Sequence, residues 1–543
     1  MSEFFYRTED IKPEEISSYF VETKKDREIL TALKARNPIV LAGSRGVGKS
    51  FLLRVAQSEL LAAFSTDKVF PVYVTFSKSS LINTQDPAQF EHWMLARICA
   101  RIVRDLSTNG LLGADPTSIA ILTGSSAGSS EPTKIEQIAE AFEESWKRPA
   151  TTVNIEGLPS IEKFKDAIED LCKSLDLARI VLLIDEAAHI FLPQQQREFF
   201  TLFRDLRSPY ITCKAAVYPG VTSYGETFQP IHDATMLALE RYVLDSDYIA
   251  NMREIVEKQA GSELISEIAR HGQNFAILAF AATGNPRVLL KTLNRSKKVN
   301  GQSVNEVIRE YYRVDIWAEH STLPEKYAGH RTLIDWGRSF IEKDVLPDLQ
   351  KKNNTYLQIG QGLDSQGERK STCFFWVHRD APQPVKEALR LLAYTGIVSE
   401  HATGIRATRS EVGSRYLVNL GCLFALEATP TIMAFRIAKS LDPRRMSEFG
   451  ANHSSYQSLL SAVPTFTEPE IGETLRRQLA KSIDVLDITW WQRDALRRLN
   501  LTTIGEVLHA SETKLQQIFY VGEKRSRRMR NAAIAAVYEY LSG

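Results

Sequence analysis

The sequence predicts an α/β fold in which a parallel sheet comes first and mostly helical domains follow. A short apolar run at residues 39–42 leads into a glycine-rich turn, and a helical apolar pattern follows at once. A second apolar run, Ile180–Ile184, contains only branched residues, as expected of a strand that is buried on both faces. Strands that alternate with helices in this way form parallel sheets.

Composition narrows the class of protein. A chain of 543 residues is long enough for several domains with a sizeable core. Its 67 basic and 66 acidic residues nearly cancel, so any nucleic-acid surface has to be local. The five cysteines lie far apart without a Cys-x-x-Cys pair, which indicates buried thiols in a reducing cytosol. No secretion signal or membrane-length apolar run is evident, so we expect a cytoplasmic protein without membrane contact.

The glycine-rich turn has the spacing of a phosphate-binding loop, Gly-x-x-x-x-Gly-Lys-Ser. Its glycines let backbone N–H groups approach phosphate oxygens, and the helix dipole points its positive end at the same anion. We expect Lys49 to reach the β- and γ-phosphates of ATP and Ser50 to ligate Mg²⁺. The alternative, a glycine-rich turn that merely precedes a helix, is disfavoured by the complete spacing after an apolar strand. The expected nucleotide-binding residues are Gly43, Ser44, Arg45, Gly46, Val47, Gly48, Lys49, Ser50 and Phe51.

Two carboxylates follow the second apolar run directly, as in a Walker B strand. We expect Asp185 to hold Mg²⁺ through its water shell and Glu186 to act as the general base on the attacking water. The alternative is a strand that ends in solvated acids. A GTPase would carry Asn-Lys-x-Asp and an ABC-type ATPase Leu-Ser-Gly-Gly-Gln, and both motifs are absent. The pair therefore favours an ATPase of another class.

Two further segments offer residues that could sense the γ-phosphate. Gly284 ends one predicted helix and Pro286 opens the next, which places Arg287 at the new helix N-terminus as a third catalytic candidate. An ordinary surface arginine is the alternative. Earlier in the chain, Tyr218 or Thr222 follows the predicted strand 211–217, although either residue could serve only the turn.

With these motifs, residues from about 15 to 300 resemble an AAA+ ATPase of the origin-recognition-complex-like initiator group. The segment from Phe20 to Glu28 resembles that group's entry segment, and Gly284–Arg287 resembles its sensor 2. The resemblance implies a P-loop AAA+ core with a parallel sheet, a helical lid that carries Arg287, and homo-oligomers. Such ATPases usually supply an arginine finger from the segment after the sensor 1 strand, but residues 208–240 contain no arginine. The sequence therefore does not decide whether one subunit activates the next. A signalling ATPase of the class called STAND, which shares this core, stays an alternative.

The central part of the chain changes character after the lid. A helix around residues 384–392 precedes strands at about 396–398, 405–409 and 415–418, with a glycine turn at Gly404. Helices followed by a β-hairpin resemble a winged-helix module, for which DNA contact and protein contact are equally open. Residues 429–480 are interpreted as a spacer.

Residues 481–543 form a compact helical series that resembles the C-terminal domain of the RNA polymerase α subunit, built from helix-hairpin-helix units. In such units the hairpin glycine, here Gly522, offers backbone N–H groups to a DNA phosphate. Tyr520 replaces the first glycine of the general motif, and Trp490 and Trp491 are expected to fill the small core. A solvated helix face is the alternative for the basic run. The expected DNA-binding residues are Gly522, Lys524, Arg525, Arg527 and Arg528.

The sequence thus predicts an ATP-binding, ATP-hydrolysing switch that binds DNA through its backbone. Initiator-like ATPases outside replication often belong to mobile elements or antiphage-defence systems, which implies a protein partner encoded nearby. The alternatives are a STAND-like signalling ATPase whose C-terminal domains bind a protein, and a nucleotide-binding scaffold with little turnover. The expected domains are the core 1–245, the lid 246–303, the winged-helix-like domain 304–428, the spacer 429–480 and the helix-hairpin-helix domain 481–543.

Overall fold

The structure of the protein is a computed structural model that forms two compact units. The N-terminal unit contains Glu3–Glu240 and Arg253–Ala260, and the C-terminal unit contains Arg241–Met252 and Gly261–Gly543. The described residues are 4–76, 78, 82, 86, 88–111, 116–124, 132–147, 152–186, 193–220, 222–225, 227–326, 330–358, 370–408, 410–462, 478–486 and 488–541.

The N-terminal unit is built on a five-stranded sheet in the order β2-β3-β4-β1-β5. All neighbouring strands are parallel, so the predicted parallel sheet is confirmed. The strand before the phosphate loop, β1, lies between β4 and β5. The strands are β1 Ile39–Ala42, β2 Val69–Thr75, β3 Arg179–Asp185, β4 Ile211–Val217 and β5 Thr235–Ala238.

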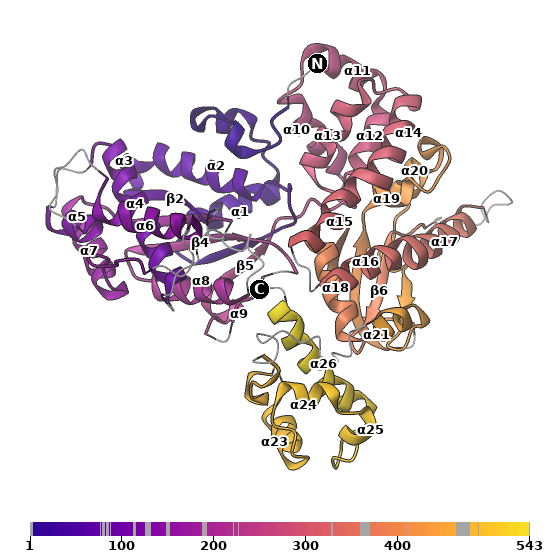
Figure 1. Ribbon diagram of the computed structural model, residues 1–543. Helices are drawn as coiled ribbons and strands as arrows, with labels where there is room; N and C mark the ends of the chain where they lie inside the picture. Colours follow the sequence, from indigo (N-terminus) through magenta and orange to yellow (C-terminus); the bar gives the residue numbers. More distant parts are fainter. Residues whose placement is uncertain are drawn as a thin grey trace. The chain divides into compact units, whose positions relative to one another are not determined.

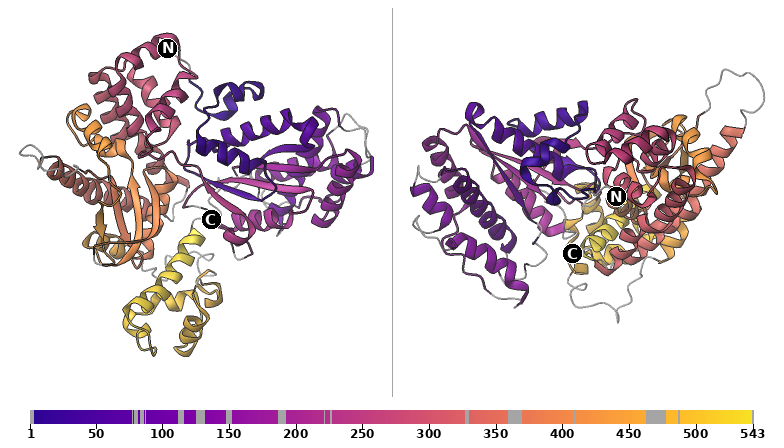
Figure 2. Two further views of the ribbon diagram at one scale, coloured as in Figure 1. Left: turned by 180° about the vertical axis from the view of Figure 1, so that it is seen from behind. Right: turned by 90° about the horizontal axis from the view of Figure 1, so that it is seen from above.

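Helices cover both faces of this sheet, as Figures 1 and 2 show. Alternate side chains of β3 enter two different cores: Val181 and Leu183 pack with the α1 and α2 side, and Leu182 and Ile184 with the α4, α6, α7 and α8 side. This two-sided burial explains the uninterrupted apolar run of the strand. The helices are η1 Thr8–Asp10, η2 Pro13–Tyr19, α1 Lys24–Lys34, α2 Lys49–Ala62, α3 Phe64–Asp67, α4 Gln89–Thr108, α5 Pro116–Thr123, α6 Lys134–Glu144, η4 Ser145–Lys147, α7 Ile161–Ser174, α8 Pro193–Asp205 and α9 Pro230–Asp233. Residues of the next helix, α10 Tyr248–Glu257, are divided between the two units.

The apolar residues between Leu237 and Val243 predict the last strand of this sheet there, but the structure places it earlier. The observed β5 spans Thr235–Ala238 and pairs with the whole length of β1. It is an edge strand whose side chains are mostly exposed. An exposed edge does not require the apolar pattern of a buried strand, and the apolar residues that follow β5 misled the prediction.

The C-terminal unit begins with the lid helices and continues into a four-stranded sheet of order β7-β8-β6-β9. Its strands are β6 Phe374–His378, β7 Val398–Arg406, β8 Val412–Val418 and β9 Ser447–Phe449. Its helices up to residue 462, in which η5 and η7 are π-helical turns, are α11 Ser262–Arg270, α12 Gly272–Ala281, α13 Pro286–Ser296, α14 Gly301–Glu310, η5 Tyr311–Asp315, α15 Ile316–Lys326, α16 Arg331–Phe340, η7 Ile341–Val345, α17 Leu346–Gln358, α18 Gln383–Tyr394, α19 Leu420–Phe424, α20 Pro430–Lys439, η9 Ser454–Tyr456 and α21 Gln457–Ala462.

Two expectations for this region are corrected. The glycine at position 404 lies inside β7, and the connection to β8 is closed by a hydrogen bond from the Ala407 N–H to the Glu411 carbonyl at 2.9 Å. The segment interpreted as a spacer contains α20 and β9, and β9 pairs with β6 as the fourth strand of the sheet. A three-residue strand is too short to show periodicity, so it left no signal in the sequence.

The C-terminal helical series has its own small core. Leu496, Ile504, Leu515 and Met529 are fully buried in it. The two tryptophans expected there are instead exposed, Trp490 by 74% and Trp491 by 38%, because they occupy the first turn of their helix and leave the core to the aliphatic side chains. The elements are η11 Ile483–Val485, α23 Trp490–Arg498, α24 Ile504–His509, α25 Glu512–Leu515 and α26 Glu523–Leu541.

Candidate functional site

The phosphate loop joins the end of β1 to the start of α2. Gly48 has a φ of +105°, a conformation that L-residues with a side chain rarely adopt, and α2 starts at the next residue. Strand β1 is held on one side by β4 and on the other by β5, so the loop starts from the interior of the sheet. The sequence folds into a loop whose backbone N–H groups sit at a helix N-terminus, which is an anion-binding arrangement.

Lys49 is held inside this loop. Its side chain is only 6% exposed, and its Nζ donates to the carbonyls of Gly43 at 2.6 Å and Ser44 at 3.1 Å. The ammonium also lies 3.9 Å from the centre of the Tyr218 ring. The hydroxyl of Thr222, the other γ-phosphate sensor considered, donates to the Tyr218 carbonyl at 2.6 Å and so takes part in the turn. Tyr218 is therefore the member of that pair that contacts a loop residue.

The acidic pair lies at the end of β3. Asp185 is 3% exposed, and each of its carboxylate oxygens accepts one hydrogen bond, from the Glu186 N–H at 2.9 Å and from the Tyr73 hydroxyl at 2.6 Å. The hydroxyl of Thr75 lies 3.4 Å from a Glu186 carboxylate oxygen. Burial, with the charge of Asp185 second, raises the pKa of Glu186 above its ordinary value. A carboxylate with a raised pKa is a better proton acceptor at neutral pH.

The oxygen donors at this site fit a magnesium ion. Mg²⁺ prefers oxygen ligands and keeps several waters, and in P-loop proteins it is held by one hydroxyl, one carboxylate and phosphate oxygens. Ser50 lies in the first turn of α2 and Asp185 ends β3, so the hydroxyl and the carboxylate of that set are present. Within the described part of the chain there is no cluster of three or more His, Cys, Asp or Glu side chains suited to a metal.

Tyr73 and Arg54 were missed by sequence reasoning. The guanidinium carbon of Arg54 lies 3.5 Å from the centre of the Tyr73 ring, and the Tyr73 hydroxyl reaches Asp185. Tyr73 and Asp185 are 112 residues apart, and they meet because β2 and β3 pair with Thr75 opposite Asp185. A tyrosine in an apolar strand is predicted only to pack in the core, so the sequence gives no indication of this contact.

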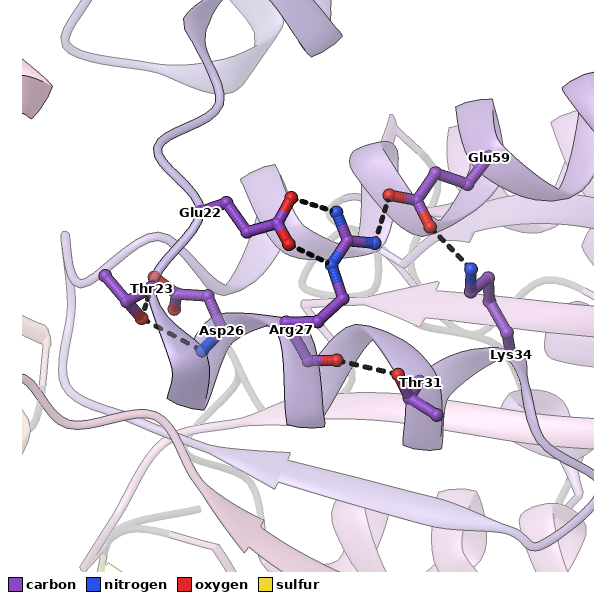
Figure 3. A network of polar contacts seen from close by, with 7 residues as sticks. All are labelled: Glu22, Thr23, Asp26, Arg27, Thr31, Lys34 and Glu59. Carbon is purple, nitrogen blue, oxygen red and sulfur yellow. Dashed lines mark hydrogen bonds and ion pairs between the residues drawn. The ribbon is translucent and has the colours of Figure 1, made fainter.

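The entry segment is fixed to α2 by a network of charged groups (Figure 3). Arg27 donates to Glu22 and, at 2.7 Å, to Glu59 on α2, and Lys34 pairs with the same Glu59 at 2.6 Å. The Phe20 ring lies 6.4 Å from the ring of Phe51, in the first turn of α2. The entry segment is thus packed beside the helix that the phosphate loop opens.

The lid turn lies in the C-terminal unit. Gly284 has a φ of +77°, and a Cβ there would meet the Arg241 carbonyl oxygen at 2.2 Å, so only glycine fits. Asn285 caps α13 by accepting a hydrogen bond from the Val288 N–H at 3.3 Å. These two residues place the half-buried Arg287 in the first turn of α13, as the sequence predicts. Arg287 belongs to a different unit from the loop and the acidic pair.

The basic residues of the C-terminal domain differ in their contacts. Gly522, Lys524, Arg525 and Arg528 are exposed around the start of α26, whereas Arg527 is half-buried and donates to Asn452 at 2.7 Å. Lys524 lies 3.7 Å from Asp380, and Arg525 donates to the Tyr520 carbonyl at 2.7 Å.

Tyr520 has a φ of +64°, the left-handed conformation that glycine favours. The tyrosine therefore does not prevent the turn that glycine makes in the general hairpin motif.

Comparison with known proteins links most of the chain to one family. The family model described as ORC-CDC6-like matches residues 4–369. Similar solved structures include the ORC2 protein of Aeropyrum pernix in ADPNP–ADP complexes (12% identity, 78% of this chain and 96% of that chain covered, TM-score 0.35). Others are the ORC1 protein of Aeropyrum pernix in complex with DNA (14%, 78% and 94%, 0.32) and a RuvB variant of Thermotoga maritima (13%, 75% and 93%, 0.29). No curated protein matches the chain.

None of the helices that the structure describes has the length and apolar character needed to cross a membrane.

Proposed function

The chain belongs to the ORC-CDC6-like family, and we propose that it is an ATP-hydrolysing switch that binds DNA. The observation that carries the proposal is the arrangement at the carboxyl edge of one parallel sheet. Buried Lys49 follows β1, and the Asp185–Glu186 pair follows β3, with β4 between the two strands. Ligands of open parallel sheets bind at this edge.

Each residue of the edge has a role in binding or hydrolysis. Lys49 exchanges its two carbonyl partners for phosphate oxygens, which are better partners for an ammonium. Bound Mg²⁺, held by Ser50 and Asp185, would supply charge neutralisation to the phosphates. Glu186 accepts the proton of the attacking water, and its raised pKa suits that role. Arg287, on the lid, is proposed as the group that responds to the γ-phosphate.

The DNA-binding part of the proposal rests on the C-terminal domain, which lies beyond the family match at residues 4–369. Exposed Lys524, Arg525 and Arg528 surround the N-terminus of α26 and the preceding Gly522. Backbone N–H groups at a helix start, with cations beside them, bind phosphates without reading bases. A STAND-like switch with a protein partner would use the same domain differently.

Trapping of ATP tests the hydrolysis proposal. We expect Glu186→Gln to bind ATP with wild-type affinity but to retain it unhydrolysed, with turnover reduced by about 10²- to 10⁴-fold. Bound nucleotide is identified by chromatography after denaturation of the full chain. Glu162→Gln, an exposed carboxyl on α7, serves as the control and should turn over ATP normally. Undiminished hydrolysis by Glu186→Gln would remove Glu186 from its role.

Charge reversal tests the DNA proposal. We expect the double variant Lys524→Glu and Arg528→Glu of the full chain to lose most of its affinity for duplex DNA in an anisotropy titration at low salt. The control pair, Lys163→Glu and Lys173→Glu, changes the net charge equally on exposed positions of α7. If both variants bind DNA like the wild type, the signalling alternative is favoured.

A further inference from the structure

The N-terminal unit holds a cavity of about 320 Å³ whose lining includes no residue of the phosphate loop. It is lined by α4, α6, the end of β2 and one residue of α2. A cavity of this size is at the lower limit of those that take small ligands. The cationic residues of its lining are Arg54, Lys78, Arg97, Arg101 and Arg104.

The lining carries more positive than negative charge. Its five cationic side chains face three carboxylates, those of Glu136, Glu140 and Glu143. Two of the carboxylates already have partners within the protein. Glu136 accepts a hydrogen bond from the Thr133 N–H at 2.8 Å, and Glu143 lies 2.7 Å from Lys78 and 3.4 Å from Arg97. Lys78 and Arg97 share the single carboxylate of Glu143, so more cationic than acidic side chains remain along the lining.

Three of the arginines lie on one helical face. Arg97, Arg101 and Arg104 are spaced by four and three residues on α4, so their side chains are neighbours. Arg101 pairs with Asp105 at 3.0 Å on the same helix, and Arg104 is exposed. Like charges at this spacing repel each other and destabilise the helix. An anion that binds between them reverses this effect.

The wall of the cavity also contacts a residue of the nucleotide site. Arg54 lines the cavity and stacks on Tyr73, 3.5 Å from the ring centre, and Tyr73 donates to Asp185. Tyr73 itself is part of the lining. A ligand in the cavity would therefore touch the side chain that holds Asp185.

We propose that this cavity binds a small anion with two or more phosphate groups, separately from the triphosphate at the phosphate loop. Guanidinium groups form paired hydrogen bonds with phosphate oxygens, and several arginines can engage several phosphates at once. The enclosure between α4 and α6 favours a small molecule over a nucleic-acid duplex. This proposal does not depend on ATP hydrolysis or on DNA binding by the C-terminal domain.

Calorimetry on the full chain tests the proposal. Lys49→Ala is introduced into every sample to weaken anion binding at the phosphate loop, and inorganic tripolyphosphate is the probe. We expect saturable binding that weakens by at least about tenfold when Arg101→Ala and Arg104→Ala are added. Adding Lys163→Ala and Lys173→Ala instead should change the affinity by less than about twofold, since these are exposed positions of α7 outside the cavity.

Several outcomes would overturn the proposal. The absence of binding to the Lys49→Ala chain would do so, as would equal affinities in the cavity and control variants. A short DNA duplex that binds in an Arg101- and Arg104-dependent way, while tripolyphosphate does not, would assign the surface to nucleic acid. Arg104→Glu alone, at an exposed position, should also weaken binding, and circular dichroism confirms that each variant is folded.

Discussion

Helices α2 and α26 both start beside a glycine and a lysine, but the two lysines differ in their burial and in their contacts. Lys49 is 6% exposed and donates to two loop carbonyls within 3.1 Å. The Lys524 side chain is 77% exposed, and its ion pair with Asp380 spans 3.7 Å. The loop carbonyls hold the buried lysine in place, whereas most of the Lys524 side chain faces solvent.

The difference predicts two kinds of binding. A buried, oriented ammonium acts at short range and is little screened by salt, so it suits one small ligand. Exposed charges act at longer range and are screened, so they suit an extended polyanion whose affinity falls steeply with salt. A substitution at one site should therefore change binding at that site and leave binding at the other site unchanged.

Among the substitutions that compare the two lysine sites, Lys49→Ala gives the largest expected effect. Loss of the charge-assisted contacts with phosphate should weaken ATP binding by about 10- to 100-fold, while DNA affinity stays within about twofold. Anisotropy of a fluorescent ATP analogue and of labelled duplex DNA measures both on the same protein. Lys163→Ala is the control. A loss of ATP affinity below about threefold would contradict the role of Lys49.

Tyr73→Phe sharpens the comparison, because it tests whether the buried site depends on Tyr73, which supports the Asp185 carboxylate through a hydrogen bond. The substitution removes the 2.6 Å hydrogen bond to Asp185 but keeps the ring on which Arg54 stacks. Supporting contacts of this kind typically contribute 10- to 100-fold to activity, so we expect a fall in turnover of about tenfold. Tyr210→Phe, a tyrosine in the turn before β4, is the control for loss of a hydroxyl. Wild-type turnover in Tyr73→Phe would show that Asp185 needs no such support.

Lys524→Ala addresses the exposed site. It should weaken DNA binding a few-fold and lower the salt slope of the affinity by about one, because one phosphate contact is lost. ATP affinity should not change. Arg527→Ala is the informative partner: this half-buried arginine is bonded to Asn452, so its loss should change the salt slope less. Equal slopes in Lys524→Ala and the wild type would exclude Lys524 from the DNA surface.

The parts of this picture that local patterns determine could be predicted from the sequence. The loop spacing, the buried run before Asp185 and the helix stop and start around Gly284 each lie within one stretch of chain, and the structure has the expected elements there. The Tyr73–Asp185 contact could not be predicted, because it depends on the register of two strands that are far apart in sequence. For the same reason, the pairing of β9 with β6 left no local trace. The exposed Trp490 and Trp491 show that apolar character alone does not assign a side chain to a core.

Thr75→Val gives the smallest expected effect and tests the protonation of the buried base. Turnover requires deprotonated Glu186, so it should fall as the pH drops through a pKa that burial and Asp185 have raised above 4.5. The Thr75 hydroxyl, 3.4 Å from the carboxylate, lowers that pKa, and its removal should move the acidic limb of the profile to higher pH by a few tenths of a unit. Steady-state rates of ATP hydrolysis from about pH 5 to about pH 8 locate this acidic limb.

The affinity for DNA should change little over the same pH range, because lysine and arginine remain charged throughout. A limb that moves to lower pH in Thr75→Val would mean that another group is titrating, and the base would have to be sought elsewhere.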